Sequence, residues 1–225
     1  FRLVGSEMCI RDSEKTLLGL NQCIQEELER GKLIGISLKK MQSGASLSAK
    51  NVFGDMKFNK DYAGYEYSGK SIDGYVKLSG GTKIQFRSFG AGLGLTGFQG
   101  EVKGANANQG KIGLGPTNMI LRSHGAPEIP TNAASRVKTD PDGVFDEIAV
   151  GLKKYARLTQ KQIEEVRESE KINTPKFLYS KLQITQLLNI LESITNRDKR
   201  NQLVEDLYLY ASSQSRFSSA YYKLE

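Results

Sequence analysis

Residues 74–89, GYVKLSGGTKIQFRSF, decide the fold. Two segments that alternate between apolar and polar side chains, GYVKL and TKIQFRSF, flank the short link SGG. Such alternation is typical of a strand with one buried face, and a short glycine-rich link between two of them is typical of a β-hairpin. The stretch therefore predicts an antiparallel hairpin. The next alternating segment, GFQGEVKG at 97–104, is expected to pair with the second strand of that hairpin.

The pattern changes on the N-terminal side of the hairpin. Residues 13–30 carry apolar side chains at spacings of three and four, which predicts an amphipathic helix. The apolar run LIGISLK at 33–39 predicts a buried strand. Residues 42–70 lack a clear period and are expected to form a long loop, with or without one short strand.

Helical periodicity dominates the C-terminal part, most clearly in 175–194 and 197–214. The predicted fold class is therefore α+β, a mainly antiparallel sheet with a packed helix, followed by a helical C-terminal half. The region between the two parts contains several prolines, which interrupt regular secondary structure. The predicted division is an α+β basic domain at 14–122, a connector at 123–142 and a helical domain at 143–225.

The first thirteen residues, FRLVGSEMCIRDS, differ in character from the rest. They resemble translated adapter sequence of the kind found at the ends of assembled gene models. We therefore expect residues 1–13 to be non-native and a part of the true N-terminus to be missing.

Residue counts exclude several classes of protein. The chain has two cysteines, Cys9 and Cys23, and one histidine, His124, whereas a structural zinc site needs about four such ligands. Zinc fingers and disulfide frameworks are excluded, and histidine catalysis would rest on His124 alone. No apolar run reaches the roughly 20 residues of a membrane helix, so no membrane partner is expected. Any enzymatic chemistry is expected to use carboxylates, lysines and a hard metal such as Mg²⁺.

The positive charge is concentrated in the first half of the chain. The formal net charge is +7, and residues 31–122 hold 13 Lys or Arg against 5 Asp or Glu. Residues 136–225 are nearly balanced, with 15 against 13. The excess predicts an anionic partner, nucleic acid, for the first half, with solubility as the alternative reason.

Two glycine-rich strings resemble phosphate-binding loops but lack their context. Residues 92–97, GLGLTG, match the dinucleotide fingerprint as letters, yet a strand rather than a helix is predicted to follow. Residues 104–111, GANANQGK, have one residue too many for a Walker A loop and are followed by Ile112 instead of Ser or Thr. Neither string predicts a nucleotide site.

The candidate catalytic residues lie in two short motifs on predicted strands. Glu101 and Lys103 flank Val102 on a predicted strand, so their side chains point to the same face. With Asp73 as a second carboxylate, Glu101 is expected to bind Mg²⁺ while Lys103 stabilises charge on a phosphate. Ser37 and Lys39 have the same spacing. The alternatives are an ordinary ion pair at Glu101 and a strand that ends in solvent at Lys39.

A basic, aromatic surface is the expected nucleic-acid contact. Its aromatic members would be Tyr75, Phe86 and Phe89, although these rings equally suit the core. The candidate nucleic-acid-binding residues are Lys40, Lys83, Arg87 and Lys111.

The segments LIGISLKK (33–40), KIQFRSFG (83–90) and FQGEVKGANANQGKIG (98–113), with the ending ASSQSRFSSAYYKLE (211–225), resemble uncharacterised proteins of marine tailed bacteriophages. A strand with acid-x-Lys, near a metal-binding Asp, also resembles the PD-(D/E)XK nuclease superfamily. That resemblance implies either Ser37 with Lys39, or Asp73 with Glu101 and Lys103, as the catalytic set. The superfamily places a helix after this strand, whereas further strands are predicted here.

The resemblance implies a phage DNA-processing protein, nuclease-like, that hydrolyses phosphodiesters with Mg²⁺ or binds DNA. The alternative is a phage virion or assembly protein without catalysis, whose lysines serve solubility or protein contacts. The expected location is the bacterial host cytoplasm or the virion, and self-association remains open.

Overall fold

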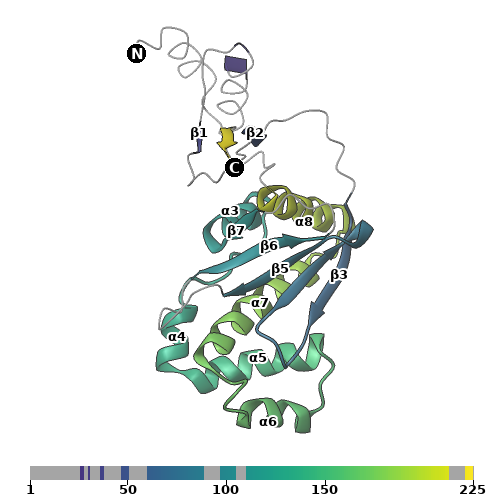
Figure 1. The fold of residues 1–225 in the computed structure, drawn as a ribbon. Coiled ribbons are helices and arrows are strands. Elements are labelled where there is room, and N and C mark those ends of the chain that lie inside the picture. Colours follow the sequence, from purple (N-terminus) through teal and green to yellow (C-terminus); the bar gives the residue numbers. More distant parts are fainter. Residues whose placement is uncertain are drawn as a thin grey trace. The chain divides into compact units, whose positions relative to one another are not determined.

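The computed structural model describes residues 26–27, 30, 36–37, 47–50, 60–88, 97–104, 110–212 and 221–224. The chain separates into two compact units (Figure 1). One unit comprises residues 59–211, and the other comprises residues 1–58 with 212–225.

Three short strands are described in the unit formed by the chain ends. Strand β8, Tyr221–Leu224, lies between β1, Ile36–Ser37, and β2, Leu47–Lys50. It pairs in parallel with β1 and antiparallel with β2. The strand expected at 33–39 is thus described over two residues. The helix expected at 13–30 lies almost wholly outside the described residues, apart from a helical Glu26 and Glu27.

The unit of residues 59–211 is built on a fully antiparallel five-stranded sheet with the order β3-β4-β5-β6-β7. The predicted hairpin is confirmed as β4 and β5. Its turn contains Gly80 and Gly81 at φ angles of 74° and 76°, in the left-handed region that favours glycine. The strands are β3 (Tyr62–Tyr67), β4 (Gly74–Leu78), β5 (Lys83–Ser88), β6 (Phe98–Lys103) and β7 (Lys111–Gly113).

Strand β3 lies in the region interpreted as a loop. Its pairing with β4 shifts register between Tyr62 and Gly64, and Gly64 has a φ angle of 101°. Such a bulge places two residues opposite one and breaks the alternation by which a strand is recognised in sequence. Together with β2, the described part of residues 42–70 therefore holds two strands.

Six helices are described after the sheet, which confirms the α+β class with helices toward the C-terminus. Their starts carry strong local signals: Thr159 and Gln162 form a reciprocal capping box, and Thr174 caps a helix that begins at Pro175. None of the helices in the described ranges is both long and apolar enough to cross a membrane. The helices are α3 (Leu114–Ser123), α4 (Ala133–Thr139), α5 (Pro141–Tyr155), α6 (Gln160–Glu168), α7 (Pro175–Ser193) and α8 (Arg197–Ala211).

The core lies between one face of the sheet and the helices. Ile84, Phe86 and Val102 are at most 1% exposed, and helices α5, α7 and α8 contact the strands on this face. In Figure 1 α7 runs behind the sheet, and nearly all of its residues from Phe177 to Leu191 are buried. The sheet and the helices thus form one unit, whereas the sequence suggested a division around residues 123–142.

Candidate functional site

The face of the five-stranded sheet opposite the helices carries charged and polar side chains, and we term it the open face. Residues directly opposed in antiparallel strands share one face of the sheet. One row of opposed residues crosses all five strands: Glu66, Tyr75, Gln85, Glu101 and Lys111. The open face is therefore continuous from β3 to β7.

A second row on the open face consists of three lysines. Lys77 on β4 opposes Lys83 on β5, and Lys83 in turn opposes Lys103 on β6. Neighbouring strands lie about 4.8 Å apart, and like charges directly opposite each other destabilise a sheet. Nearby carboxylates or a bound anion would relieve this repulsion.

Carboxylates on the same face offset part of that repulsion. Lys83 Nζ lies 3.2 Å from Glu66 Oε2, and Lys103 Nζ lies 2.6 Å from Glu101 Oε2. At the edge, the side chain of Asp73 lies 3.8 Å from Nη1 of Arg87. All three basic side chains still expose 35–38% of their surface. With Lys77 and Lys111 included, the open face holds five basic and three acidic side chains.

The surroundings of Glu101 on the open face lower the pKa of its carboxyl group. A hydrogen bond from Lys103 lowers its pKa, and the nearby charges of Lys103, Lys111 and Arg87 act in the same direction against partial burial. Glu101 therefore stays ionised to lower pH than an isolated glutamate.

The centre of the open face combines an aromatic ring with amide groups. The ammonium of Lys83 lies 4.3 Å from the centre of the Tyr75 ring, and Gln85 donates a hydrogen bond to the Tyr75 hydroxyl at 3.2 Å. The Oε1 atoms of Gln85 and Gln99 are buried, and the described residues supply no donor to either. Both oxygens are closed to solvent, and each leaves an acceptor in the sheet without a donor among the described residues.

The structure brings together six of the nine predicted site residues and places one, Ser37, in the other unit. Ser37 belongs to β1, and Lys39 and Lys40 lie outside the described residues. Phe86, weighed as a surface aromatic, is a core residue at 1% exposure. The residues found on the open face or at its edge are Asp73, Lys83, Arg87, Glu101, Lys103 and Lys111.

The expected magnesium site would rest on Asp73 and Glu101. Mg²⁺ is often held by one or two carboxylates together with substrate phosphates, so two carboxylates meet the minimum. Each of them, however, already faces a cation, Arg87 or Lys103. In the part of the chain that is described, no group of three or more His, Cys, Asp or Glu side chains could hold a metal ion.

Sequence reasoning missed Lys77 and Gln99, although the signal was present. Both follow the alternation of their strands, with Lys77 two residues after Tyr75 and Gln99 two residues before Glu101. The open face therefore extends the predicted surface by an ammonium and an amide.

A buried lysine behind the sheet was also missed. Lys181 on α7 is 0% exposed, and its ammonium lies 4.2 Å from the centre of the Tyr67 ring. Burial lowers the pKa of Lys181 to about 7, against the opposing influence of the Asp73 carboxylate. The only signal in the sequence is a lysine within the largely apolar run 177–191.

The single histidine, His124, forms a largely buried contact between two helices. His124 Nε2 lies 2.7 Å from Asp206 Oδ2, and both side chains are largely buried. The pair joins the end of α3 to α8. This contact explains a histidine here without any catalytic role.

No known protein family, curated protein or solved structure matches the chain. The resemblance to phage proteins and to the PD-(D/E)XK nucleases therefore stays a prediction, and the geometry of the open face carries the functional interpretation.

Proposed function

We propose that the protein binds nucleic acid through the open face. The observation that supports this most is the row formed by Lys77, Lys83 and Lys103, three ammonium groups directly opposed on neighbouring strands. Only two of the three have a carboxylate within ion-pair distance among the described residues. A phosphate backbone lying across the row would relieve the remaining repulsion.

The rest of the open face favours single-stranded over duplex nucleic acid. Sheet faces that bind single strands combine basic side chains with aromatic rings for base stacking and with polar groups for base edges. Tyr75 offers a ring at the centre, and the amide side chains of Gln85 and Gln99 lie beside the basic residues on the same face. A paired duplex hides those base edges from a flat surface.

Phosphodiester hydrolysis is the second candidate, because one contact favours it. Glu101 and Lys103 project from the same face of one strand, the placement that an acid-x-Lys motif has, and they touch at 2.6 Å. In this reading Asp73 and Glu101 hold Mg²⁺, which activates the attacking water, while Lys103 turns toward the phosphate. Magnesium-dependent nicking by the full chain would support hydrolysis, and it would be lost in the Glu101→Gln variant.

Binding is best tested by fluorescence anisotropy with a labelled single-stranded oligonucleotide at low salt. We expect affinity to fall with rising salt, with a shallow slope because the face has only two more basic than acidic side chains. The Lys77→Gln and Lys83→Gln variants should each bind about two- to fivefold more weakly and reduce the salt slope by about one.

Matched controls come from exposed lysines on other elements, Lys153→Gln on α5 and Lys161→Gln on α6. These controls should bind like the parent chain. If all four variants lost affinity equally, the binding would depend on the total charge of the protein and not on the open face. Undetectable binding at low salt would contradict the proposal and favour the virion or assembly alternative.

A further inference from the structure

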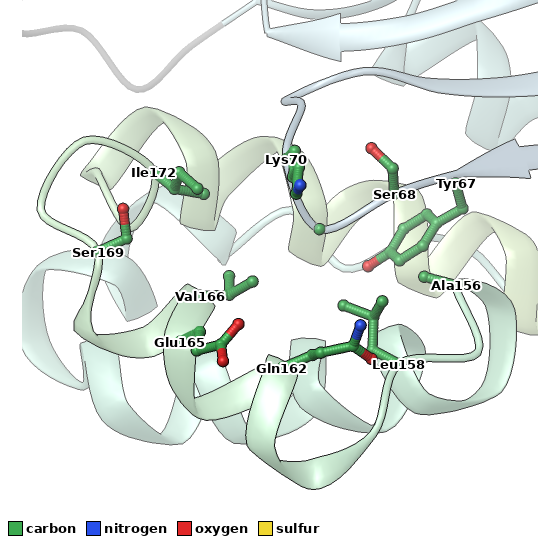
Figure 2. A pocket seen from close by; sticks show the side chains of 11 residues that line it. Tyr67, Ser68, Lys70, Ala156, Leu158, Gln162, Glu165, Val166, Ser169 and Ile172 are labelled. Atoms are coloured by element: carbon green, nitrogen blue, oxygen red, sulfur yellow. The ribbon is translucent and has the colours of Figure 1, made fainter.

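A pocket of about 360 Å³ lies within the unit of residues 59–211, away from the open face (Figure 2). Its walls come from the turn at residues 67–70, the end of α5, and α6 with the segment that follows it. This volume falls in the range of small-molecule sites in proteins.

The floor of the pocket is apolar and closely packed. It consists of the side chains of Leu158, Val166 and Ile172. A methyl group added at Gly69 would lie only 2.9 Å from Leu158 Cδ1 and 3.1 Å from Val166 Cγ2, so the backbone of the turn rests directly on this floor. The turn and the floor are therefore in direct van der Waals contact.

One wall is held rigid by contacts behind it. The hydroxyl of Tyr67 lies 2.6 Å from Thr185 Oγ1, and its ring packs edge-on against Tyr155 with centroids 5.9 Å apart. A fixed aromatic wall beside an apolar floor suits a flat or bulky apolar group.

Two opposite charges stand on different sides of this apolar space. Figure 2 shows Lys70 on one side and Glu165 on the other, with Val166 between them. Both residues are exposed, and the described residues offer neither side chain an ion pair or hydrogen bond. The neighbouring Glu164 differs, because it accepts a hydrogen bond from Gln160 at 2.7 Å.

We infer that this pocket binds a small zwitterionic amphiphile. Its apolar or aromatic body would lie on the floor of Leu158 and Val166, its carboxylate or phosphate would face Lys70, and its amine would face Glu165. Pockets that bind small molecules are mostly apolar, with a few polar groups that fix the orientation of the ligand. This inference does not depend on the function proposed for the open face.

A series of four indoles separates the contributions of the two charges. 5-(Aminomethyl)indole-3-propionate carries both charges at opposite ends of the ring system, 5-(aminomethyl)indole only the amine, indole-3-propionate only the carboxylate, and indole neither. The protein contains no tryptophan, so the fluorescence of the indole reports binding directly when it is excited beyond the absorption band of tyrosine. We expect 5-(aminomethyl)indole-3-propionate to bind most tightly and indole most weakly, with each charge contributing about two- to fivefold in affinity.

Two variants of the full chain test the assignment of the charges. Lys70→Gln should weaken the binding of 5-(aminomethyl)indole-3-propionate and of indole-3-propionate but leave that of 5-(aminomethyl)indole unchanged. Glu165→Gln should weaken the binding of 5-(aminomethyl)indole-3-propionate and of 5-(aminomethyl)indole but leave that of indole-3-propionate unchanged. The matched controls Lys171→Gln and Glu164→Gln, which change charge outside the pocket, should behave like the parent protein.

Three outcomes would overturn the inference. They are undetectable binding of 5-(aminomethyl)indole-3-propionate, equal affinity for all four indoles, and losses in the control variants as large as those in Lys70→Gln and Glu165→Gln.

Discussion

The ammonium of Lys181 donates a hydrogen bond to the backbone carbonyl of Asp73 at 2.7 Å. This contact joins the interior of α7 to the residue that precedes β4, at the edge of the open face. A helix of the C-terminal half thus helps to position Asp73, whose side chain faces Arg87.

The burial of Lys181 should make stability depend on pH. Its pKa is about 7 in the folded protein and about 10.4 in an unfolded chain. Between these values the unfolded state binds one more proton, so raising the pH favours folding by up to about 1.4 kcal/mol per pH unit. Urea unfolding between pH 7 and pH 9.5, the upper limit set roughly by tyrosine ionisation, measures this slope.

The Lys181→Met variant should lose that increase in stability, because methionine fills similar space without a titrating group. Lys176→Gln, an exposed change on the same helix, is the matched control and should keep it. Parallel stability curves for the parent chain and Lys181→Met would contradict a buried lysine with a lowered pKa.

Replacing Glu101 by Gln distinguishes binding from hydrolysis. In the binding reading the change removes a negative charge from the open face and frees Lys103, so affinity for a single-stranded oligonucleotide should rise about two- to fivefold. In the hydrolysis reading the same change removes a metal ligand and abolishes magnesium-dependent nicking. Anisotropy and a nicking assay on the same variant decide between the two readings.

Gly100 should not tolerate even a methyl group. An added Cβ would lie 2.7 Å from the Phe86 ring and 2.8 Å from a methyl group of Ile112, both in the core. Gly100→Ala should lower the free energy of unfolding by about 1–3 kcal/mol through overpacking. Urea titration measures the loss, and the adjacent Gln99→Ala, on the open face, should cost clearly less.

The pair of His124 and Asp206 should contribute to stability through a buried contact. His124→Ala should reduce the free energy of unfolding by about 1–3 kcal/mol, because the Asp206 carboxylate loses this partner while it stays buried. A double-mutant cycle with Asp206→Ala measures the coupling between the two side chains. Additive single effects would show that the contact does not stabilise the fold.

The amino-acid sequence by itself determined the local elements of this protein. Alternation around Ser79, Gly80 and Gly81 predicted the β4–β5 hairpin, because side chains of a strand project to opposite faces and glycine accepts the turn. Helix starts at Thr159 and Thr174 were equally local, because each cap depends only on residues three positions apart. Strand β3 was missed because its bulge interrupts the period.

Only the tertiary structure decided which of these elements meet. Spacing within one strand placed Glu101 and Lys103 on one face, but the row of Lys77, Lys83 and Lys103 depends on the register of three strands. The pocket joins residues 67–70 to residues 156–172, and Lys181 reaches Asp73 from 108 residues away. Backbone preferences and periodicity act over a few residues, whereas burial of the sheet against the helices selects these long-range contacts.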